Sequence, residues 1–375
     1  MRVRQYSSFE NLPGATRDCL TSAGRRNFFF SISWFQALLE KASPSGDQLC
    51  IFVAETSEHP TAILVAKQRN EAGALRSHML LGLSQGTYTS LYGPILHDDG
   101  GAEGLREILL TIARTRPSFD VLRFDSLERR APAFDLMVTV FRSAGMIVQP
   151  FFNFRNWFEN VSGLSVEEYR SSRSPETRDL ISRHVGCIEE SGRGRFQLIT
   201  GGAGLPAALT NYELVDLQSW KPPEPYPFFI PQIVHSAARA GVLRLGLFYI
   251  DNEPAAAQIW IVNGGKATIL RVHYAEKFAE LEVETVLTYE MFRHVIENDQ
   301  IEEIDFDRRS DPYTRQWLKC CRERAGLLIF NPRTVKGSII ASRHVGGHLL
   351  MDCARKLGIA GRNASDLSVA PKYRL

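Results

Sequence analysis

Two blocks of the chain show the same succession of apolar and polar positions. In each block an apolar, β-prone run is followed by an acidic turn and by a second apolar run that begins with proline. The runs are residues 49–54 and 60–66 in the first block, and residues 243–250 and 254–262 in the second. Proline is tolerated at the first position of a strand, where its missing N–H breaks no ladder hydrogen bond. The pattern predicts one β-hairpin in each half of the chain.

A second pair of matching segments follows the two hairpins. A short strand-like run leads to a proline and then to a helix-like run that ends before a glycine. The strands are residues 120–125 and 301–307, the prolines are Pro132 and Pro312, and the glycines are Gly145 and Gly326. Proline in the first turn and glycine just past the last turn are typical helix ends. The repeated order predicts a duplicated fold, with chance similarity of two α/β halves as the alternative.

The repeat suggests a division of the chain into two domains and a tail. We expect the first copy to span residues 1–160, the second copy residues 161–337, and a C-terminal helix and tail residues 338–375. Ser165 is a plausible helix N-cap at the start of the second copy, because a glutamate stands three residues later. In the tail, residues 339–357 have a helix-like pattern, and the remainder is polar.

Composition narrows the class of protein. A chain of 375 residues suits two or three domains. Its net charge of +2 argues against a general nucleic-acid coat, and we expect no DNA partner. The six cysteines show no CxxC spacing, so we expect no metal site, no disulfide framework and a cytoplasmic location. No apolar run is long enough for a signal peptide or a transmembrane segment, and hydrolase and nucleotide-phosphate motifs are missing.

The stretch from Tyr212 to Trp317 resembles the acyl-transferring half of the GNAT superfamily. It contains Ser219-Trp220-Lys221, three apolar strands, a helix, a strand at residues 301–307, and then Asp311-Pro312-Tyr313. The nearest likeness is to the large two-domain branch with the CelD-like proteins, and more distantly to the FemAB peptidyltransferases. The resemblance implies an α/β (α+β) fold of tandem duplicated GNAT-like domains, each a mixed twisted sheet flanked by helices. The first copy would be degenerate.

The resemblance also implies acetyl-CoA or another acyl-CoA as co-substrate. In this superfamily the donor lies where two parallel strands splay apart, and its pyrophosphate faces the N-terminus of the next helix. The cofactor-binding residues would be Ile269, Leu270, Arg271 and Val272 on the strand, and Glu284 and Thr285 at the helix start.

The turn before that helix departs from the family pattern. Residues 278–285 contain three glutamates and no glycine, whereas the relatives carry a glycine-containing turn. Carboxylates repel a pyrophosphate, and a Cβ atom limits close approach to the backbone. The alternative to acyl-CoA binding is therefore a degenerate pocket or one that takes another ligand.

Three side chains are candidate catalytic groups. Asp305 matches the aspartate of the family's strand-end motif and could accept the proton of an attacking amine. Tyr313, at the next helix start, could protonate the departing thiolate, and His273 in the fourth strand could serve as a base. The structural alternatives are that Tyr313 packs in the core and that His273 is a satisfied core or rim residue.

Trp220 and Lys221 are the candidate substrate-binding residues. The resemblance places them before the helix that faces the acceptor, and the proline-rich segment 222–227 after them could form a stiff wall of the pocket. A core tryptophan followed by a rigid linker is the alternative reading of the same residues.

Together these features predict an enzyme, an N-acyltransferase that moves an acyl group from acyl-CoA to an amine. The acceptor could be a sugar, lipid or peptide precursor of envelope or polysaccharide. One alternative is a FemAB-like transferase that uses charged tRNA, for which residues 171–195 are the candidate basic segment. Another is a non-catalytic binding module with the GNAT fold. The sequence identifies neither the acceptor, the acyl chain length nor the oligomeric state.

Overall fold

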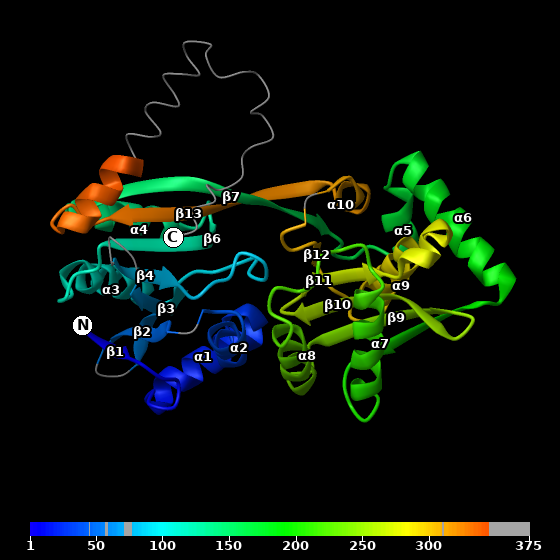
Figure 1. Ribbon diagram of the computed structural model, residues 1–375, viewed down its shortest axis with the longest axis horizontal. Helices are drawn as coiled ribbons and strands as arrows, with labels where there is room; N and C mark the ends of the chain where they lie inside the picture. Colours follow the sequence, from blue (N-terminus) through cyan, green and yellow to red (C-terminus); the bar gives the residue numbers. More distant parts are fainter. Residues whose placement is uncertain (45, 57–58, 71–76, 310, 345–375) are drawn as a thin grey trace, which may run out of the picture. The chain divides into compact units, whose positions relative to one another are not determined.

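The computed structural model describes residues 1–44, 46–56, 59–70, 77–309 and 311–344 (Figure 1). Two compact units divide the chain. Unit 1 consists of Met1–Ser22, Ser43–Phe154 and the chain from Glu323 onward, and unit 2 consists of Ala23–Ala42 and Arg155–Arg322. Each unit contains a mixed sheet with helices packed on it, so the expected α/β (α+β) class is confirmed.

In unit 1 the strands follow the order β1-β2-β3-β4-β6-β13-β7, with the short β5 paired to β3. The strands are β1 (Arg2–Tyr6), β2 (Gln48–Glu55), β3 (Pro60–Asn70), β4 (His78–Gly82), β5 (Ile95–Leu96), β6 (Val121–Glu128), β7 (Ile147–Asn160) and β13 (Cys320–Phe330). The helices are α1 (Gly14–Arg26), α3 (Gly101–Arg114) and α4 (Pro132–Ser143).

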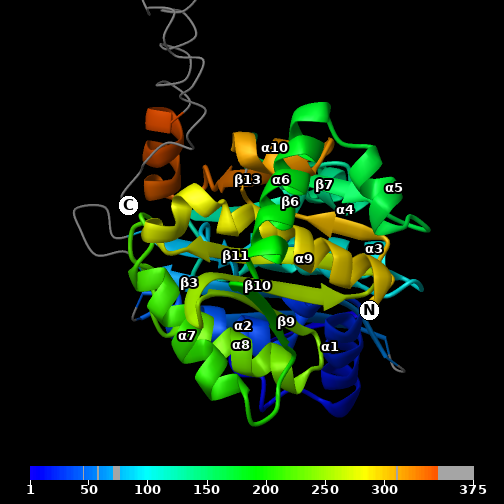
Figure 2. The same ribbon diagram turned by 90° about the vertical axis from the view of Figure 1, so that its right-hand side faces the viewer.

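In unit 2 the end of β7 begins a sheet with the order β7-β12-β11-β10-β9-β8. The strands are β8 (Gly194–Ile199), β9 (Leu243–Ile250), β10 (Glu253–Asn263), β11 (Lys266–Tyr274) and β12 (Glu303–Asp305). The α-helices are α2 (Ile32–Lys41), α5 (Val166–Ser171), α6 (Pro175–Ser191), α7 (Leu205–Leu217), α8 (Phe229–Arg239), α9 (Val283–Glu297) and α10 (Pro312–Trp317), with 3-10 helices η1 (Phe28–Phe30) and η2 (Glu276–Leu281). Figure 2 shows α7 and α8 on one face of this sheet and α9 on the other.

The two units repeat one order of elements, and the duplication expected from the sequence is confirmed. Both predicted hairpins form, as β2–β3 and β9–β10. In each unit the next strand is followed by a helix and then by a parallel neighbour, β4 with β6 and β11 with β12. A helix that begins with proline and a long final strand complete each copy.

The final strand of each copy pairs in the sheet of the other unit. Residues 158–160 of β7 pair with β12, and residues 324–330 of β13 pair with β6. Each compact unit therefore consists of several stretches of the chain. The sequence had suggested two continuous ranges, residues 1–160 and 161–337. The pattern of a strand shows which side chains are buried but not which strand lies beside it. Of the predicted helix at residues 339–357, only 339–344 are described, and these are helical.

The core of unit 2 fills the space between its sheet and helix α9. Trp260, Phe292 and Trp317 are almost completely buried there, and the ring centroids of Phe292 and Trp317 lie 5.1 Å apart. This packing holds α9 against β10 and β11, and Trp317 joins α10 to α9 through Phe292.

Candidate functional site

Strands β11 and β12 separate partway along β11. They pair in parallel only at residues 266–268, which face residues 303–305. Residues 269–274 pair with β10, and no described strand pairs with them on the β12 side. Backbone groups on that side have no strand partner, and those that no side chain binds are available to a ligand. The predicted strand residues Ile269 to Val272 lie at this opening.

A β-bulge lies at the same place. On β10, Ile259 faces Arg271 and Trp260 faces Ile269, which leaves Leu270 without an opposite residue. Bulges redirect neighbouring side chains and are frequent next to active sites. The carbonyl of Leu270 accepts a hydrogen bond from Nη1 of Arg271 at 2.7 Å, and the carbonyl of Val272 accepts one from Nζ of Lys221.

Helix α9 begins beside this strand without a side-chain cap. The residue before its first turn is Glu282, in the left-handed region at φ 50°, and its carboxylate accepts a hydrogen bond from Thr285 Oγ1 at 3.0 Å. An uncapped helix N-terminus presents free N–H groups and the positive end of the helix dipole. The start of α9 thus offers a position for an anion.

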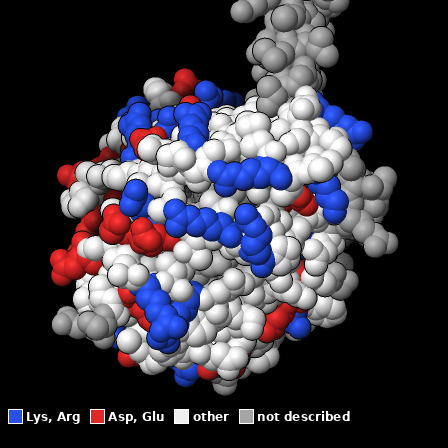
Figure 3. Space-filling model, turned by 90° about the vertical axis from the view of Figure 1, so that its left-hand side faces the viewer, with Lys and Arg blue, Asp and Glu red and all other residues white. Residues whose placement is uncertain are grey.

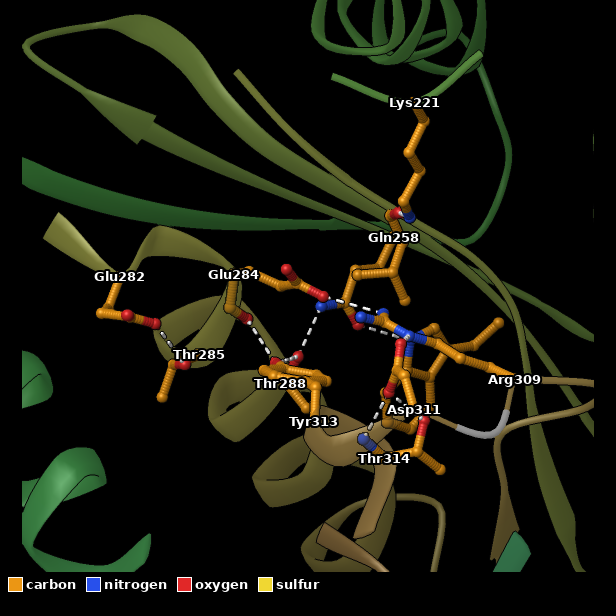
Figure 4. Close-up of polar contacts among 12 residues, drawn as sticks. Lys221, Gln258, Glu282, Glu284, Thr285, Thr288, Arg309, Asp311, Tyr313 and Thr314 are labelled. Carbon is orange, nitrogen blue, oxygen red and sulfur yellow. Dashed lines mark hydrogen bonds and ion pairs between the residues drawn. The ribbon is translucent and has the colours of Figure 1, made fainter. Parts of the chain in front are cut away.

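Arg309 offsets the charge of Glu284, the glutamate in the first turn of α9. Its Nη1 lies 2.8 Å from Glu284 Oε1, and its Nε lies 2.5 Å from Asp311 Oδ2 (Figure 4). Burial disfavours the charge on Arg309, but these two carboxylates outweigh burial and raise its pKa. The repulsion expected from the sequence is therefore reduced at Glu284. Arg309 was missed because a loop arginine carries no periodic signal.

Tyr313 points from α10 into the same cluster (Figure 4). Its Oη lies 2.7 Å from Thr288 Oγ1 and donates to the carbonyl of Glu284 at 3.2 Å. Thr288 Oγ1 also accepts a hydrogen bond from Gln258 Nε2 at 2.6 Å. Burial raises the pKa of Tyr313 well above its usual value, so the hydroxyl stays protonated near neutral pH and can donate hydrogen bonds. Gln258, a polar residue in an apolar strand, was the available sequence signal for this network.

His273 lies on the face of β11 that packs against α7. Its Nδ1 is 3.0 Å from Asp216 Oδ1, although the angle is poor for a hydrogen bond, and the ring of Tyr212 packs edge-on at 5.5 Å. Its Nε2 is buried and has no hydrogen-bond partner among the described residues. Burial lowers the pKa of His273 despite Asp216, so the imidazole is neutral at pH 7 and can accept a proton. Asp216 was not among the predicted residues.

The two predicted substrate-binding residues occupy different environments. Lys221 extends toward β11, where burial first, and then the charge of Arg309, lower its pKa to about 8. Trp220 is 61% exposed. Close to Lys221, Arg271 forms an ion pair with Glu224 on the proline-rich segment. Lys221 therefore lies at the opening beside β11, whereas Trp220 lies at the surface.

Asp305 ends β12 opposite Thr268, and its carboxylate belongs to a cluster with Arg322. Arg322 Nη2 lies 3.1 Å from Asp305 Oδ2, and Arg322 also holds Glu303 with two contacts at 2.7 and 3.0 Å. The other oxygen of Asp305 accepts a hydrogen bond from the N–H of Asp307 at 3.0 Å. Burial raises the pKa of Asp305. Because both oxygens already have partners, His273 is the better candidate for the base.

The equivalent opening in unit 1 is filled by the unit's own chain. Strands β4 and β6 pair in parallel at residues 79–81 and 121–123, and beyond them Tyr92 forms a bridge with Leu127. The hydroxyl of Tyr92 donates to the carbonyl of Val65 at 2.6 Å. A Cβ atom on Gly82 would lie only 2.6 Å from the Tyr92 ring, which occupies the gap. Unit 2 is therefore the better candidate for ligand binding.

The left-handed backbone at Glu282 leads to a prediction about stability. We expect Glu282→Gly to raise the free energy of unfolding by about 0.5–1 kcal/mol, because glycine adopts this conformation without a Cβ penalty. Urea denaturation is the measurement. Glu280→Gly removes the same charge from a residue of η2 without positive φ, and it should be neutral or destabilising. Equal effects of the two variants would show that backbone strain is not the cause.

Comparison with known proteins agrees with this geometry. Residues 176–315 match the family described as acetyltransferase (GNAT) domain. The crystal structure of FemX aligns with 90% of this chain and 100% of its own at 9% identity, with a TM-score of 0.61. The C-terminal domain of a protein described as "Putative Lysylphosphatidylglycerol Synthetase" from Agrobacterium fabrum aligns with 88% of this chain and 95% of its own at 10% identity, with a TM-score of 0.53. A conserved protein of unknown function from Bacteroides thetaiotaomicron VPI-5482 aligns with 86% of this chain and 98% of its own at 10% identity, with a TM-score of 0.52.

These comparisons support a GNAT acetyltransferase domain in unit 2. Structural likeness at such low identity shows the fold alone. The more specific likeness to the CelD-like branch is not confirmed by them. No curated protein matches the chain. Within the described residues, no helix is long and apolar enough to cross a membrane, and no group of three or more acidic, histidine or cysteine side chains could hold a metal ion.

Proposed function

We propose that unit 2 transfers an acyl group from acyl-CoA to an amine. The observation that supports this most is the opening between β11 and β12, which lies beside the uncapped start of α9. Side chains able to move or hold a proton lie near both faces of β11, with Tyr313 on the α9 side and His273 on the α7 side. The resemblance and the family match favour the same reaction.

The residues present fit such a donor. The first-turn N–H groups of α9 and the guanidinium of Arg309 would face its phosphates, since Arg309 can exchange its contact with Glu284 for one with phosphate. The backbone of residues 269–274 pairs with a strand on the β10 side only, and its other side would hold the extended arm of the donor. When bound, acyl-CoA supplies a thioester, which is an activated carbonyl for attack by an amine.

The side chains around the opening would then carry the chemistry. His273 accepts the proton that the amine loses as the nitrogen–carbon bond forms, and Asp216 stabilises the resulting imidazolium. Tyr313 exchanges its contact with the Glu284 carbonyl and donates a hydrogen bond to the sulfur as the carbon–sulfur bond breaks. Lys221, mostly protonated at pH 7 with a pKa of about 8, stabilises negative charge on the carbonyl oxygen.

The alternative donor, a charged tRNA, has less support. A tRNA needs a surface of available cations, and residues 171–195 were the candidate. There, Arg173 pairs with Glu159, Arg183 with Asp179 and Arg193 with Asp251. Helix α6 also carries four carboxylates, Glu176, Asp179, Glu189 and Glu190, so this segment is not a strongly basic surface.

Calorimetric titration with acetyl-CoA and longer acyl-CoAs tests the donor. We expect a Kd below about 1 mM, and Arg309→Gln should weaken binding by about tenfold, because it removes a charge-assisted contact to phosphate. Arg315→Gln, at an exposed arginine of α10, is the matched control and should leave binding unchanged. Failure of every acyl-CoA to bind at several millimolar would contradict the donor assignment. Assays of aminoacyl-tRNA binding would then decide between the two remaining hypotheses.

A further inference from the structure

One end of unit 1 collects basic side chains from three separate segments. These segments are the α3–β6 connection with the last residue of α3 (residues 114–120), the α4–β7 turn with the last turn of α4 (142–147), and residues 331–344 after β13. They contact one another: the N–H of Asn331 donates to the carbonyl of Asp120 at 3.0 Å, and Arg333 Nη2 donates to the carbonyl of Ala144 at 2.7 Å. We call their joint surface the basic end of unit 1.

The charge on the basic end is one-sided. Its cations are Arg114, Arg116, Arg142, Arg333, Lys336 and Arg343, and its one carboxylate is Asp120, which is 5% exposed and accepts a hydrogen bond from the N–H of His78. None of the five arginines pairs with a carboxylate of the described residues. Because the whole chain carries a net charge of only +2, this is a local concentration of positive charge. Figure 3 views this side of the molecule and shows blue side chains spread across it, with the largest red group toward the left and smaller red groups among the blue ones.

Helix chemistry explains part of this pattern, but not all of it. Arg333 and Arg116 donate to carbonyls at the ends of α4 and α3, where cations complement the helix dipole. Those contacts leave further donors of both guanidinium groups directed at solvent. Arg343 and Arg114 are exposed, and no side-chain hydrogen bond holds either of them among the described residues.

Exposed aliphatic side chains lie within the same surface. Val335 is 78% exposed and Ile147 is 40% exposed. Phe119, the one phenylalanine, tyrosine or tryptophan of these segments, is 3% exposed and therefore cannot stack on a base. Cations together with aliphatic side chains are typical of a surface that enters the headgroup region of an anionic bilayer. Single-stranded nucleic acids are instead bound by exposed aromatic rings along a basic groove.

We propose that the basic end of unit 1 docks the protein on an anionic lipid membrane. The cations contact lipid phosphates, while Val335 and Ile147 enter the boundary between headgroups and acyl chains. This binding site is separate from the opening in unit 2 and does not depend on the proposed acyl transfer. The opening in unit 1 is filled by its own chain, so the role proposed for unit 1 is membrane binding.

Flotation of the full chain with lipid vesicles tests the proposal. The protein should bind vesicles of equimolar phosphatidylglycerol and phosphatidylcholine but not vesicles of phosphatidylcholine alone. Raising the salt concentration about tenfold should release it, because screening weakens the attraction. The triple variant Arg114→Gln, Arg142→Gln, Arg343→Gln should reduce vesicle affinity by at least about tenfold.

Two further variants keep this result interpretable. The control variant Arg178→Gln, Arg183→Gln, Arg193→Gln removes the same charge from unit 2 and should bind as the unaltered protein does, and melting temperatures report whether each variant folds. Val335→Ser should weaken binding by about threefold without changing its salt dependence, as expected for a lost aliphatic contact. The proposal is overturned if the unaltered protein does not bind anionic vesicles, or if the two triple variants bind equally. It is also overturned if the basic-end variant loses RNA binding but keeps vesicle binding.

Discussion

Replacing His273 with Asn should lower turnover by about 10²–10⁴-fold, the range expected when a general base is removed. His273 is 4% exposed and lies between Asp216 and Tyr212, so its Nε2 is held in one position without a partner among the described residues. A buried nitrogen of this kind is suited to a substrate proton. The measurement is the rate of thiol release from acyl-CoA in the presence of an amine acceptor. His235→Asn, which changes an exposed histidine of α8, is the control and should retain full activity.

The pH profile separates a base from a merely structural histidine. Only neutral imidazole accepts a proton, so turnover should fall as the pH drops through the pKa of His273. Burial lowers this pKa, so the fall should occur below the ordinary value of about 6.5. Asp216→Asn should move it further down, because the imidazolium loses its counter-ion. An unchanged profile in Asp216→Asn, or nearly full activity in His273→Asn, would rule out this assignment.

Replacing Arg322 with Met should lower the free energy of unfolding by about 3–5 kcal/mol, the usual cost of breaking a buried ion pair from one side. Arg322 holds Glu303 with two contacts and Asp305 with a third, and it also donates to Asn156 Oδ1 at 2.6 Å. Without Arg322, two largely buried carboxylates at the end of β12 lose their main cation. Urea denaturation measures the loss. Arg183→Met removes an exposed ion pair on α6 and should cost no more than about 0.5 kcal/mol.

The pH dependence of this loss has a defined sign. In Arg322→Met the folded-state pKa of Asp305 and Glu303 should rise above their unfolded values. Above the raised pKa both carboxylates are ionised and destabilise the folded state in full. As the pH falls through this pKa they become protonated, and the destabilisation is lost. Adding Asp305→Asn to Arg322→Met should therefore restore stability at neutral pH. If Asp305→Asn alone abolished turnover at an unchanged melting temperature, Asp305 would be the base instead of His273.

Much of the fold follows from local pattern. Continuous apolar runs bounded by acidic turns determine the two hairpins, and the apolar spacing of α4 and α9 determines helices that pack on a sheet. The order of these elements along the chain was sufficient to predict a duplicated α/β (α+β) fold, whereas the ligand position beside β11 is a hypothesis that rests on the family resemblance. Such features depend on residues that are close together in the chain, and they can therefore be predicted from a single sequence.

Only the tertiary structure decided the features that join residues far apart in the chain. Alternation along β7 and β13 reveals their faces, but the exchange of these strands between units depends on which edges meet. Arg309 contacts Glu284, which is 25 residues away in the sequence, and Asp216 contacts His273, which is 57 residues away. No pattern in the sequence indicates either contact. The sequence alone determined which of these elements form. The pairing of charges within the candidate site, and the contact of Asp305 with Arg322, came from folding, because they depend on distances that no local pattern encodes.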